Sequence, residues 1–183
     1  MSKSYLIFRT DRIGDFLITA PVLKAIKNNF PNSKIHLVAS LSNYDFIKKL
    51  NLIDKIYLLD RSSYLSKLKL YFELRKMKFD NIIVADKKKS SIFITFLLRS
   101  KNKIFNLSKK LHIKILRLFF KNLIHDNDDA KNDNLNVLKK NSNYLNFELS
   151  NKDFKFFSEN FFDAHKIENI DQLNKNYGIF HYD

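Results

Sequence analysis

The sequence of 183 residues contains no cysteine and has only two glycines and two prolines. Without cysteine, the chain cannot form disulfides, use a thiolate nucleophile or bind a metal through sulfur. No apolar run approaches the ~18–20 residues of a transmembrane helix. The first apolar run is interrupted by Arg9, Asp11 and Arg12, which a signal peptide does not tolerate. From these absences and the length we expect one good-sized domain in the cytoplasm.

Positive charge is in excess, with a formal net charge of +14 at pH 7. Such a charge favours an anionic partner: nucleic acid, a phosphorylated lipid surface or a sugar phosphate. The sequence is also rich in lysine, asparagine, isoleucine and phenylalanine, which is typical of a genome-wide compositional bias. The charge therefore has two interpretations, one functional and one compositional. Nucleic acid is the least expected partner, because no recognised reading motif is present.

The stretch of residues 5–31 organises the rest of the chain. It opens with the apolar run Tyr5–Phe8, which predicts a strand buried on both faces of a parallel sheet. Gly14 marks a position where we expect that no side chain is tolerated. From Asp15 onward apolar residues recur at helical spacing, and we expect this helix to bend or restart at Pro21. Asp15 would lie at the helix N-terminus, either as a capping residue or as a carboxylate facing a ligand.

Strand and helix patterns alternate along the following part of the chain. Short apolar runs predict strands at Lys34–Ser40, Lys55–Asp60, Asn81–Asp86 and Lys103–Leu107. Helical patterns between them predict helices at Asn43–Leu50, Tyr64–Lys78 and Ser90–Arg99. This alternation with short loops is typical of a doubly wound parallel sheet, so the expected fold class is α/β and Rossmann-like.

The segment Lys109–His125 predicts a further helix with a continuous basic stripe. The stripe consists of Lys110, Lys114, Arg117 and Lys121. It has two interpretations, a solvated helix face or a contact with an anionic membrane surface.

Beyond this helix the pattern is less regular. The polar segment Asp126–Asn134 predicts a loop. Helices are predicted at Leu135–Phe147 and Ser150–Phe162, and the pair Ser150 and Asp153 resembles a capping box. We assign residues 1–168 to one domain, and residues 169–183 to a linker and the first strand of a second domain.

Charged and hydroxyl side chains follow the predicted strands at their carboxyl ends. In a parallel sheet these ends meet at one edge, where open α/β folds bind ligands. The residues placed there are Asp11, Arg12, Asp15, Ser40, Ser42, Asn43, Arg61, Ser62, Ser63, Asp86, Lys87, Lys88 and Lys89. A carboxylate at this edge can accept a proton, while the cations hold phosphates or sugar acids. The five histidines are too scattered for a metal site or a catalytic triad.

The segment Thr10–Ser40 contains the block Arg-Ile-Gly-Asp, ending at Asp15, and a Thr-x-Pro sequence after it. In this it resembles the opening signature of glycosyltransferase family 9, the bacterial heptosyltransferases of lipopolysaccharide core assembly. The segment Lys78–Phe105 is similar to the family's fourth-strand block and the helix after it, and His125–Leu138 resembles the family more faintly. The resemblance covers nearly the whole chain, but only the N-terminal half of the family.

The resemblance implies two Rossmann-like domains in the GT-B arrangement, the N-terminal one binding the acceptor and the C-terminal one the nucleotide-sugar. It implies inverting transfer from a donor such as ADP-heptose, with no metal and no other cofactor. Asp15 falls on the family's catalytic aspartate, the general base that takes the proton of the acceptor hydroxyl. Together with the strand-end residues, the resemblance predicts acceptor binding by Thr10, Arg12, Gly14, Arg61, Lys87, Lys88 and Lys89.

On this interpretation the chain is the acceptor-binding half of an enzyme and is inactive without a donor domain. The expected partner is a lipid-linked or phosphorylated sugar acceptor, in the cytoplasm or at the inner face of the cytoplasmic membrane. Two alternatives stay open. Asp11 and Asp60 end predicted strands much as in phosphoacceptor signalling domains, although the usual acidic pair is missing. The other alternative is a basic module that binds nucleic acid or other anions.

Overall fold

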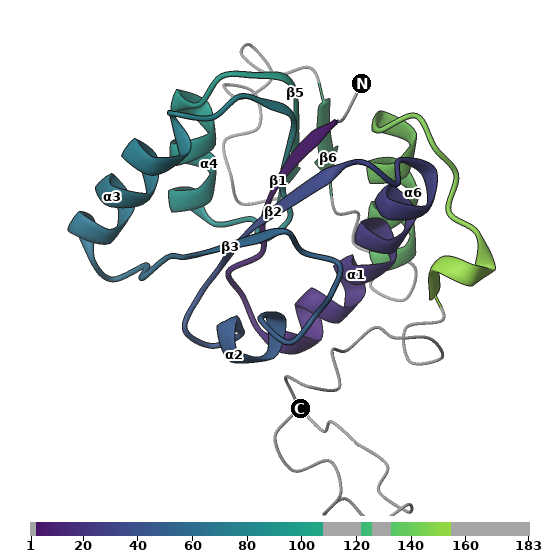
Figure 1. Cartoon of the computed structure of the whole chain (residues 1–183), viewed down its shortest axis with the longest axis horizontal. Helices are drawn as coiled ribbons and strands as arrows, with labels where there is room; N and C mark the ends of the chain where they lie inside the picture. The colour runs from purple at the N-terminus through teal and green to yellow at the C-terminus, as the bar shows by residue number, and fades with distance from the viewer. Residues whose placement is uncertain (1–2, 108–121, 126–132, 155–183) are drawn as a thin grey trace, which may run out of the picture.

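The computed structural model describes residues 3–107, 122–125 and 133–154 of the chain. They form a six-stranded parallel sheet in the order β3-β2-β1-β4-β5-β6, with helices on both faces (Figure 1). The strands are β1 (Ser4–Phe8), β2 (Lys34–Ala39), β3 (Lys55–Leu58), β4 (Phe79–Val84), β5 (Ser100–Leu107) and β6 (Asn122–His125). The helices are α1 (Ile13–Asn29), α2 (Tyr44–Ile47), α3 (Tyr64–Leu74), α4 (Lys89–Leu97) and α6 (Asp133–Tyr144), followed by the 3-10 helix η1 (Asn151–Phe154). The strand order reverses between β1 and β4, as in Rossmann-like folds, and confirms the predicted fold class.

The strand β1 lies in the interior of the sheet because its side chains are apolar on both sides. Tyr5 and Ile7 pack into the core on one face, and Leu6 and Phe8 pack into the core on the other. All four are fully buried. β2 and β4 pair with β1 in parallel register on its two edges. The continuous apolar run therefore specifies a strand buried on both faces, as predicted.

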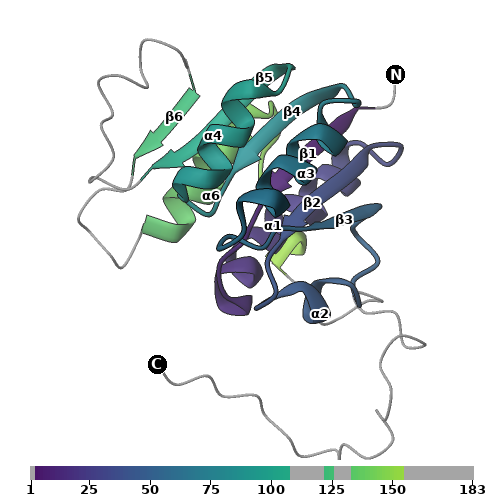
Figure 2. The ribbon, with the colours of Figure 1, turned by 90° about the vertical axis from the view of Figure 1, so that its left-hand side faces the viewer.

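The helices form two layers, one on each face of the sheet (Figures 1 and 2). The first, here called the α1 layer, contains α1, α2 and α6; its buried apolar side chains include Phe16, Leu23, Ile26, Ile47 and Leu138. The second, here called the α3–α4 layer, packs on the opposite face through Leu70, Leu74, Ile92, Ile94 and Leu98. The loops that lead from the strands into α1 and α4 meet at the carboxyl edge of the sheet.

Two predictions about α1 are wrong in part. The helix runs from Ile13 to Asn29 through Pro21 and does not restart there, although the ring removes one backbone donor. The other expectation, a bend at Pro21, stays a prediction. Ala20, Val22 and their neighbours are buried on both sides of the proline, and this packing stabilises the helix against the local loss. Gly14 has no positive φ, and a Cβ there would meet nothing within 4 Å. A side chain would therefore fit at position 14, and the prediction that none is tolerated there is wrong.

The C-terminal predictions need further corrections. The predicted helix Lys109–His125 is wrong at its end, because Asn122–His125 form β6 beside β5; the rest of it lies outside the described residues. The predicted loop Asp126–Asn134 is also wrong at its end, since α6 begins at Asp133. Ser150 does begin a turn, with its amide donating to Asp153 at 2.7 Å. That turn is the 3-10 helix η1, and residues 155–183, including the predicted linker and strand, lie outside the described residues.

Other element boundaries shift by a few residues. α3 ends at Leu74 and α2 spans only Tyr44–Ile47, so both are shorter than predicted. Within the described ranges, no helix combines the length and apolar character needed to cross a membrane.

Candidate functional site

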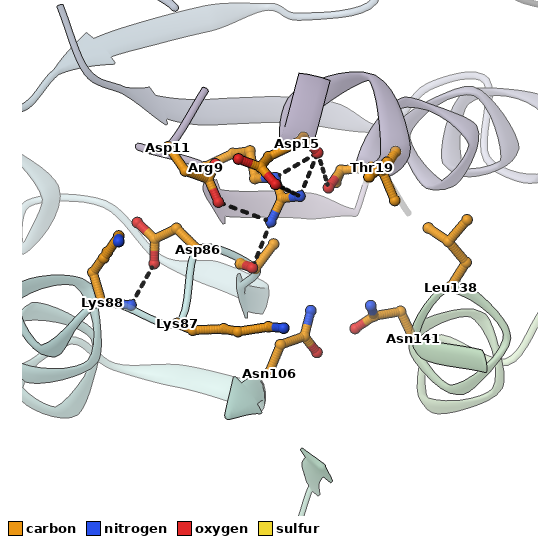
Figure 3. A pocket seen from close by; sticks show the side chains of 12 residues that line it. Arg9, Asp11, Asp15, Thr19, Asp86, Lys87, Lys88, Asn106, Leu138 and Asn141 are labelled. Atoms are coloured by element: carbon orange, nitrogen blue, oxygen red, sulfur yellow. Dashed lines mark hydrogen bonds and ion pairs between the residues drawn. The ribbon is translucent and has the colours of Figure 1, made fainter. Parts of the chain in front are cut away.

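A cleft of about 380 Å³ opens at the carboxyl edge of the sheet, beside the α1 layer (Figure 3). It lies where β1 and β4 end, at the point where the strand order reverses. Its lining comes from the ends of β1, β4 and β5 and from α1 and α6: Arg9, Asp11, Asp15, Ile18, Thr19, Ala85, Asp86, Lys87, Lys88, Asn106, Leu138 and Asn141. Ligands of open α/β sheets bind at this kind of position.

Arg9 fixes the first turn of α1 to the end of β4. Its guanidinium donates from Nη1 to the carbonyl oxygen of Ala85 at 2.6 Å and from Nε to the carbonyl oxygen of Asp15 at 2.8 Å. A second contact runs from Nη2 to the same Asp15 carbonyl. Arg9 is 7% exposed, and its planar fork of donors suits several acceptors at once. It therefore holds the floor of the cleft together.

Asp86 fixes the first turn of α4, in the α3–α4 layer, to the end of β1. Its carboxylate accepts hydrogen bonds from the hydroxyls of Thr10 at 2.5 Å and Ser91 at 2.6 Å. It also accepts from the backbone amides of Thr10 and Lys88. Ser91 belongs to the first turn of α4, so Asp86 joins β1, β4 and α4. Thr10 is fully buried and bonded to Asp86, which gives this predicted acceptor-binding residue a structural part behind the cleft wall.

Asp15 lies in the first turn of α1 with its side chain 44% exposed. Its Oδ2 accepts a hydrogen bond of 3.3 Å from the amide of Arg12, so the carboxylate helps to cap the helix. Its Oδ1 lies 4.0 Å from Nη2 of Arg9. The two interpretations of Asp15 are therefore compatible: one oxygen caps the helix while the residue still lines the cleft.

Asp11 is a second carboxylate of the cleft, and it is more buried than Asp15. Its Oδ2 lies 3.3 Å from Nη1 of Arg9, and none of the described residues donates a hydrogen bond to its buried Oδ1. Burial is the main cause that raises the pKa of Asp11 to about 6; the neighbouring Asp15 and Asp86 act in the same direction and Arg9 against it. Asp11 therefore titrates close to neutral pH.

The lysines after β4 divide between the cleft and the surface. Lys87 and Lys88 line the cleft, and Lys87 has a φ of 55°, which is uncommon for a residue with a side chain. Its side chain extends towards Asn106 in Figure 3. Lys89 is the first residue of α4, is exposed and does not line this cleft. Two of the three predicted lysines thus lie with Asp15.

The remaining predicted residues lie beside the cleft. Arg61 lines a separate pocket of about 540 Å³ that follows β2 and β3. Ser42 lines that pocket too, and its hydroxyl donates to the carbonyl oxygen of Asp11 at 3.1 Å, so the two hollows are neighbours. Arg12 and Gly14 are exposed at the start of α1 without lining either hollow.

Four polar residues of the cleft are not among those predicted from the sequence: Arg9, Thr19, Asn106 and Asn141. Asn106 and Asn141 are 2% and 4% exposed, and none of the described residues donates a hydrogen bond to the side-chain oxygen of either. Figure 3 shows the two amides turned towards each other across the cleft. Buried amide oxygens of this kind need a donor. Arg9 and Asn106 could have been noticed as polar residues at strand ends, whereas nothing in the sequence indicates Asn141.

No group of three or more histidine, aspartate or glutamate side chains in the described part of the chain could hold a metal ion. Asp11, Asp15 and Asp86 line the same cleft, but Arg9 lies among them and Asp86 uses its oxygens for buried donors. These carboxylates therefore serve hydrogen bonds and ion pairs.

By sequence, the chain matches no family model and no curated protein. By structure, it matches solved glycosyltransferases. One is the glycosyl transferase family 9 protein from Veillonella parvula DSM 2008, with 17% sequence identity and a TM-score of 0.62 over 76% of this chain and 42% of that chain. Another is E. coli heptosyltransferase WaaC bound to ADP-2-deoxy-2-fluoro heptose, with 15% identity and a TM-score of 0.64 over 81% of this chain and 50% of that chain. The ADP complex of WaaC gives nearly the same match, with a TM-score of 0.63.

At these identities the likeness is one of fold. It confirms the resemblance to glycosyltransferase family 9 at that level: the chain has the α/β architecture found in these structures. The chain spans about half the length of the WaaC structures and 42% of the Veillonella one. The activity, substrates and partners of such an enzyme are therefore not carried over with the fold.

Proposed function

We propose that the chain is the acceptor-binding half of an inverting, heptosyltransferase-like glycosyltransferase. In this proposal a nucleotide-sugar, ADP-heptose or a close relative, donates its sugar to a lipopolysaccharide core or related glycan. The observation that carries the proposal is the carboxylate of Asp15, nearly half exposed in a cleft that also contains Lys87 and Lys88. The fold supports the same class of enzyme, since its structural neighbours are glycosyltransferases.

Asp15 is the proposed general base. An acceptor hydroxyl in the cleft would lose its proton to Asp15 as its oxygen attacks the anomeric carbon of the donor sugar. The bond from that carbon to the diphosphate breaks in the same displacement, and ADP leaves with the bonding electrons. Attack from the side opposite the leaving group inverts the configuration. General-base assistance of this kind contributes about 10²–10⁴-fold to the rate.

Arg9 would hold the general base in place rather than react itself. Its two contacts with the Asp15 carbonyl fix the first helical turn, and Asp15 Oδ2 is held by the Arg12 amide. The base is therefore mounted on a rigid helix end and not on a mobile loop. Such positioning matters because small displacements of a catalytic group cost large factors in rate.

The other groups of the cleft suit a phosphorylated sugar. Lys87 and Lys88 supply positive charge for phosphate oxygens. Asn106 and Asn141 offer amide oxygens that can accept hydrogen bonds from sugar hydroxyls, which are donors of the kind these buried atoms lack. Arg61 in the neighbouring hollow, with Arg12, Gly14 and Lys89 exposed beside the cleft, completes the proposed acceptor-binding set. The buried Thr10 would support this set from behind the cleft wall through its hydrogen bond to Asp86. No metal or other cofactor is part of this proposal.

The test uses the full-length product of the gene with ADP-heptose and a phosphorylated core oligosaccharide. Asp15→Asn keeps the shape of the side chain and its capping oxygen but removes the base. We expect turnover, measured as ADP release, to fall about 10²–10⁴-fold while acceptor affinity in calorimetry stays close to that of the parent. Unchanged turnover would remove Asp15 from the mechanism.

Two further variants sharpen this test. Lys87→Gln should weaken acceptor binding about ten- to a hundredfold through the loss of a charge-assisted contact. Asp45→Asn is the matched control, because Asp45 is an exposed aspartate on α2 that pairs with Lys48 and does not line the cleft. A protein that releases no ADP with any phosphorylated glycan acceptor would contradict the proposed reaction as a whole.

A further inference from the structure

The outer surface of the α3–α4 layer exposes an unusual number of large apolar side chains. They are Tyr64, Leu65, Leu68, Phe72, Phe93, Phe96 and Leu97. Leu65 is 79% exposed and Phe93 is 65% exposed. Single exposed apolar residues are ordinary, but a gathering of them marks an interaction surface.

The spacing places these side chains on one stripe of each helix. Leu65, Leu68 and Phe72 follow each other at three and four residues, so they share one side of α3. Phe93, Phe96 and Leu97 do the same on α4. The opposite sides of both helices pack on the sheet. Since α3 and α4 lie next to each other on the same face of the sheet (Figure 2), both apolar stripes face outward in the same direction. We call this surface the outer face.

Positive charge surrounds the outer face. Exposed cations on or beside the two helices are Lys69, Arg75, Lys76, Lys88, Lys89 and Arg99. The acidic residue within α3 is Glu73, which pairs with Lys55 at 3.1 Å, and the stretch from Lys87 to Arg99 contains no acidic residue. Arg75 also stacks its guanidinium 5.7 Å from the ring of Phe72. Apolar and basic groups are thus interleaved.

We propose that the outer face docks on an anionic membrane surface. Phenylalanine and leucine side chains enter the boundary between headgroups and acyl chains, while lysine and arginine stay at the level of the lipid phosphates. The charge decides against a second copy of the chain, because two outer faces would bring the same cations together. The helices would lie along the membrane plane, and docking would need no membrane-spanning segment.

This surface also has a favourable position relative to the cleft. Lys88 lines the cleft and directly precedes α4. Arg61 and Ser62, which line the neighbouring hollow, lie just before α3 in the chain. Docking through α3 and α4 would therefore bring the loop of Lys87 and Lys88, one wall of the cleft, towards the lipid surface, where a lipid-linked acceptor lies. This last consequence rests on the proposed function; the docking itself does not.

The experiment measures co-sedimentation of the chain with vesicles of pure phosphatidylcholine and with vesicles that contain about one third phosphatidylglycerol, an anionic lipid. Three triple variants are compared with the parent. The first, Leu65→Ser with Phe72→Ser and Phe93→Ser, removes exposed apolar groups. The second, Lys69→Ser with Arg75→Ser and Lys76→Ser, removes charge from the outer face. The control, Lys24→Ser with Lys139→Ser and Lys140→Ser, removes the same charge from the α1 layer.

We expect the parent to bind the anionic vesicles and to bind phosphatidylcholine much more weakly. The charge variant should lose on the order of a hundredfold in affinity for the anionic vesicles, and the apolar variant at least about tenfold. The control should bind nearly as the parent does. Equal losses in the control and the charge variant would overturn the assignment to this face, and so would an apolar variant that binds normally.

Two more readouts separate this proposal from its rivals. The parent could instead fail to bind vesicles and form dimers as its concentration rises. If the apolar variant then stays monomeric, the outer face is an interface with a second copy of the chain and the membrane proposal is wrong. Transfer to a soluble oligosaccharide in the absence of vesicles should be unchanged in the apolar variant. Failure of docking and failure of the proposed transferase activity are therefore distinguishable.

Discussion

The two helix layers use apolar residues for different purposes. α1 buries Phe16, Leu23 and Ile26 completely against the sheet, whereas α3 buries Leu70 and Leu74 but leaves further apolar side chains more than half exposed. Apolar area stabilises the fold only when it is removed from water. The α1 layer thus seals the core, and the outer residues of the α3–α4 layer contribute little to folding. An apolar residue in this sequence is evidence of a core only once its partner surface is known.

The two helix layers also differ in the charge of the buried group that anchors each of them at the carboxyl edge of the sheet. Arg9 ties the first turn of α1 to the end of β4 through backbone carbonyls. Asp86 ties the first turn of α4 to the end of β1 through the hydroxyls of Thr10 and Ser91. One layer is held by a buried cation and the other by a buried anion. Arg9 and Asp86 both line the cleft, so its floor contains a buried cation and a buried anion.

The largest expected effect is in the core of the α1 layer. Phe16 is fully buried and packs edge-on against Phe46 with ring centroids 6.2 Å apart. Phe16→Ala should lower the free energy of unfolding by about 3–5 kcal/mol, from lost burial and the cavity left behind. Urea unfolding followed by circular dichroism measures it. If that variant does not fold, Ile26→Val should still cost about 0.5–1.5 kcal/mol. A loss near zero in both variants would contradict the sealed core.

A smaller loss is expected at the anchor of the other layer. Asp86→Asn replaces one accepting oxygen by a donor, so a buried hydroxyl of Thr10 or Ser91 or a buried amide loses its acceptor. The free energy of unfolding should fall by about 1–3 kcal/mol. Asp60→Asn is the matched comparison, because Asp60 also follows a strand but bonds to the exposed Ser62. A variant at Asp60 that loses as much as the one at Asp86 would show that burial is not the deciding factor.

The pH dependence of stability tests the charge inside the cleft. Asp11 has its pKa raised from 3.8 to about 6, chiefly by burial. A raised pKa means that the folded chain binds this proton more tightly, so the contribution of Asp11 to stability is complete below pH 3.8 and is lost as the pH rises through about 6. Asp11→Asn stays uncharged at every pH. The stability of this variant relative to the parent should therefore increase from pH 4 to pH 7.

Unfolding midpoints in urea at several pH values measure this difference. Asp45→Asn is the control with the opposite sign, because the hydrogen bond from Lys48 lowers the pKa of Asp45. As the pH rises through the acidic range, the parent gains the ionised pair of Asp45 with Lys48. The stability of Asp45→Asn relative to the parent should therefore fall with rising pH. A flat difference curve for Asp11→Asn would show that Asp11 has an ordinary pKa in the folded chain.

Much of the fold follows from local patterns of sequence. The run Tyr5–Phe8 predicts a strand buried on both faces, and the regular alternation after it predicts the parallel sheet. The errors arise where tertiary packing decides. Pro21 lies inside a helix because its neighbours are buried. The stretch Asn122–His125 pairs with β5, and four residues are too few for periodicity to separate strand from helix.

The candidate site was predictable only in the part that lies at strand ends. Asp15 lies in the first turn of the helix after β1 and Lys87 lies in the loop after β4, and parallel strands bring such positions together at one edge of the sheet. Asn141 comes from α6, and its place in the cleft depends on how that helix packs on α1 and on the sheet. The strand-end pattern predicts Arg61 beside the lysines, but Arg61 lines the neighbouring hollow. The order of strands in the sheet, which the sequence pattern leaves open, decides which loops share a cleft.

The smallest expected effect completes the comparison of the two layers. Phe72 is 51% exposed and Phe93 is 65% exposed on the outer face, so Phe72→Ala and Phe93→Ala should each change the free energy of unfolding by no more than about 0.5 kcal/mol. The same chemical change at Phe16 would cost several times more, because only there does the ring leave a cavity. Urea unfolding of the three variants under one condition measures the contrast directly. A large loss at Phe72 or Phe93 would mean that the ring is covered in solution, and the outer face would then belong to the fold rather than to a membrane.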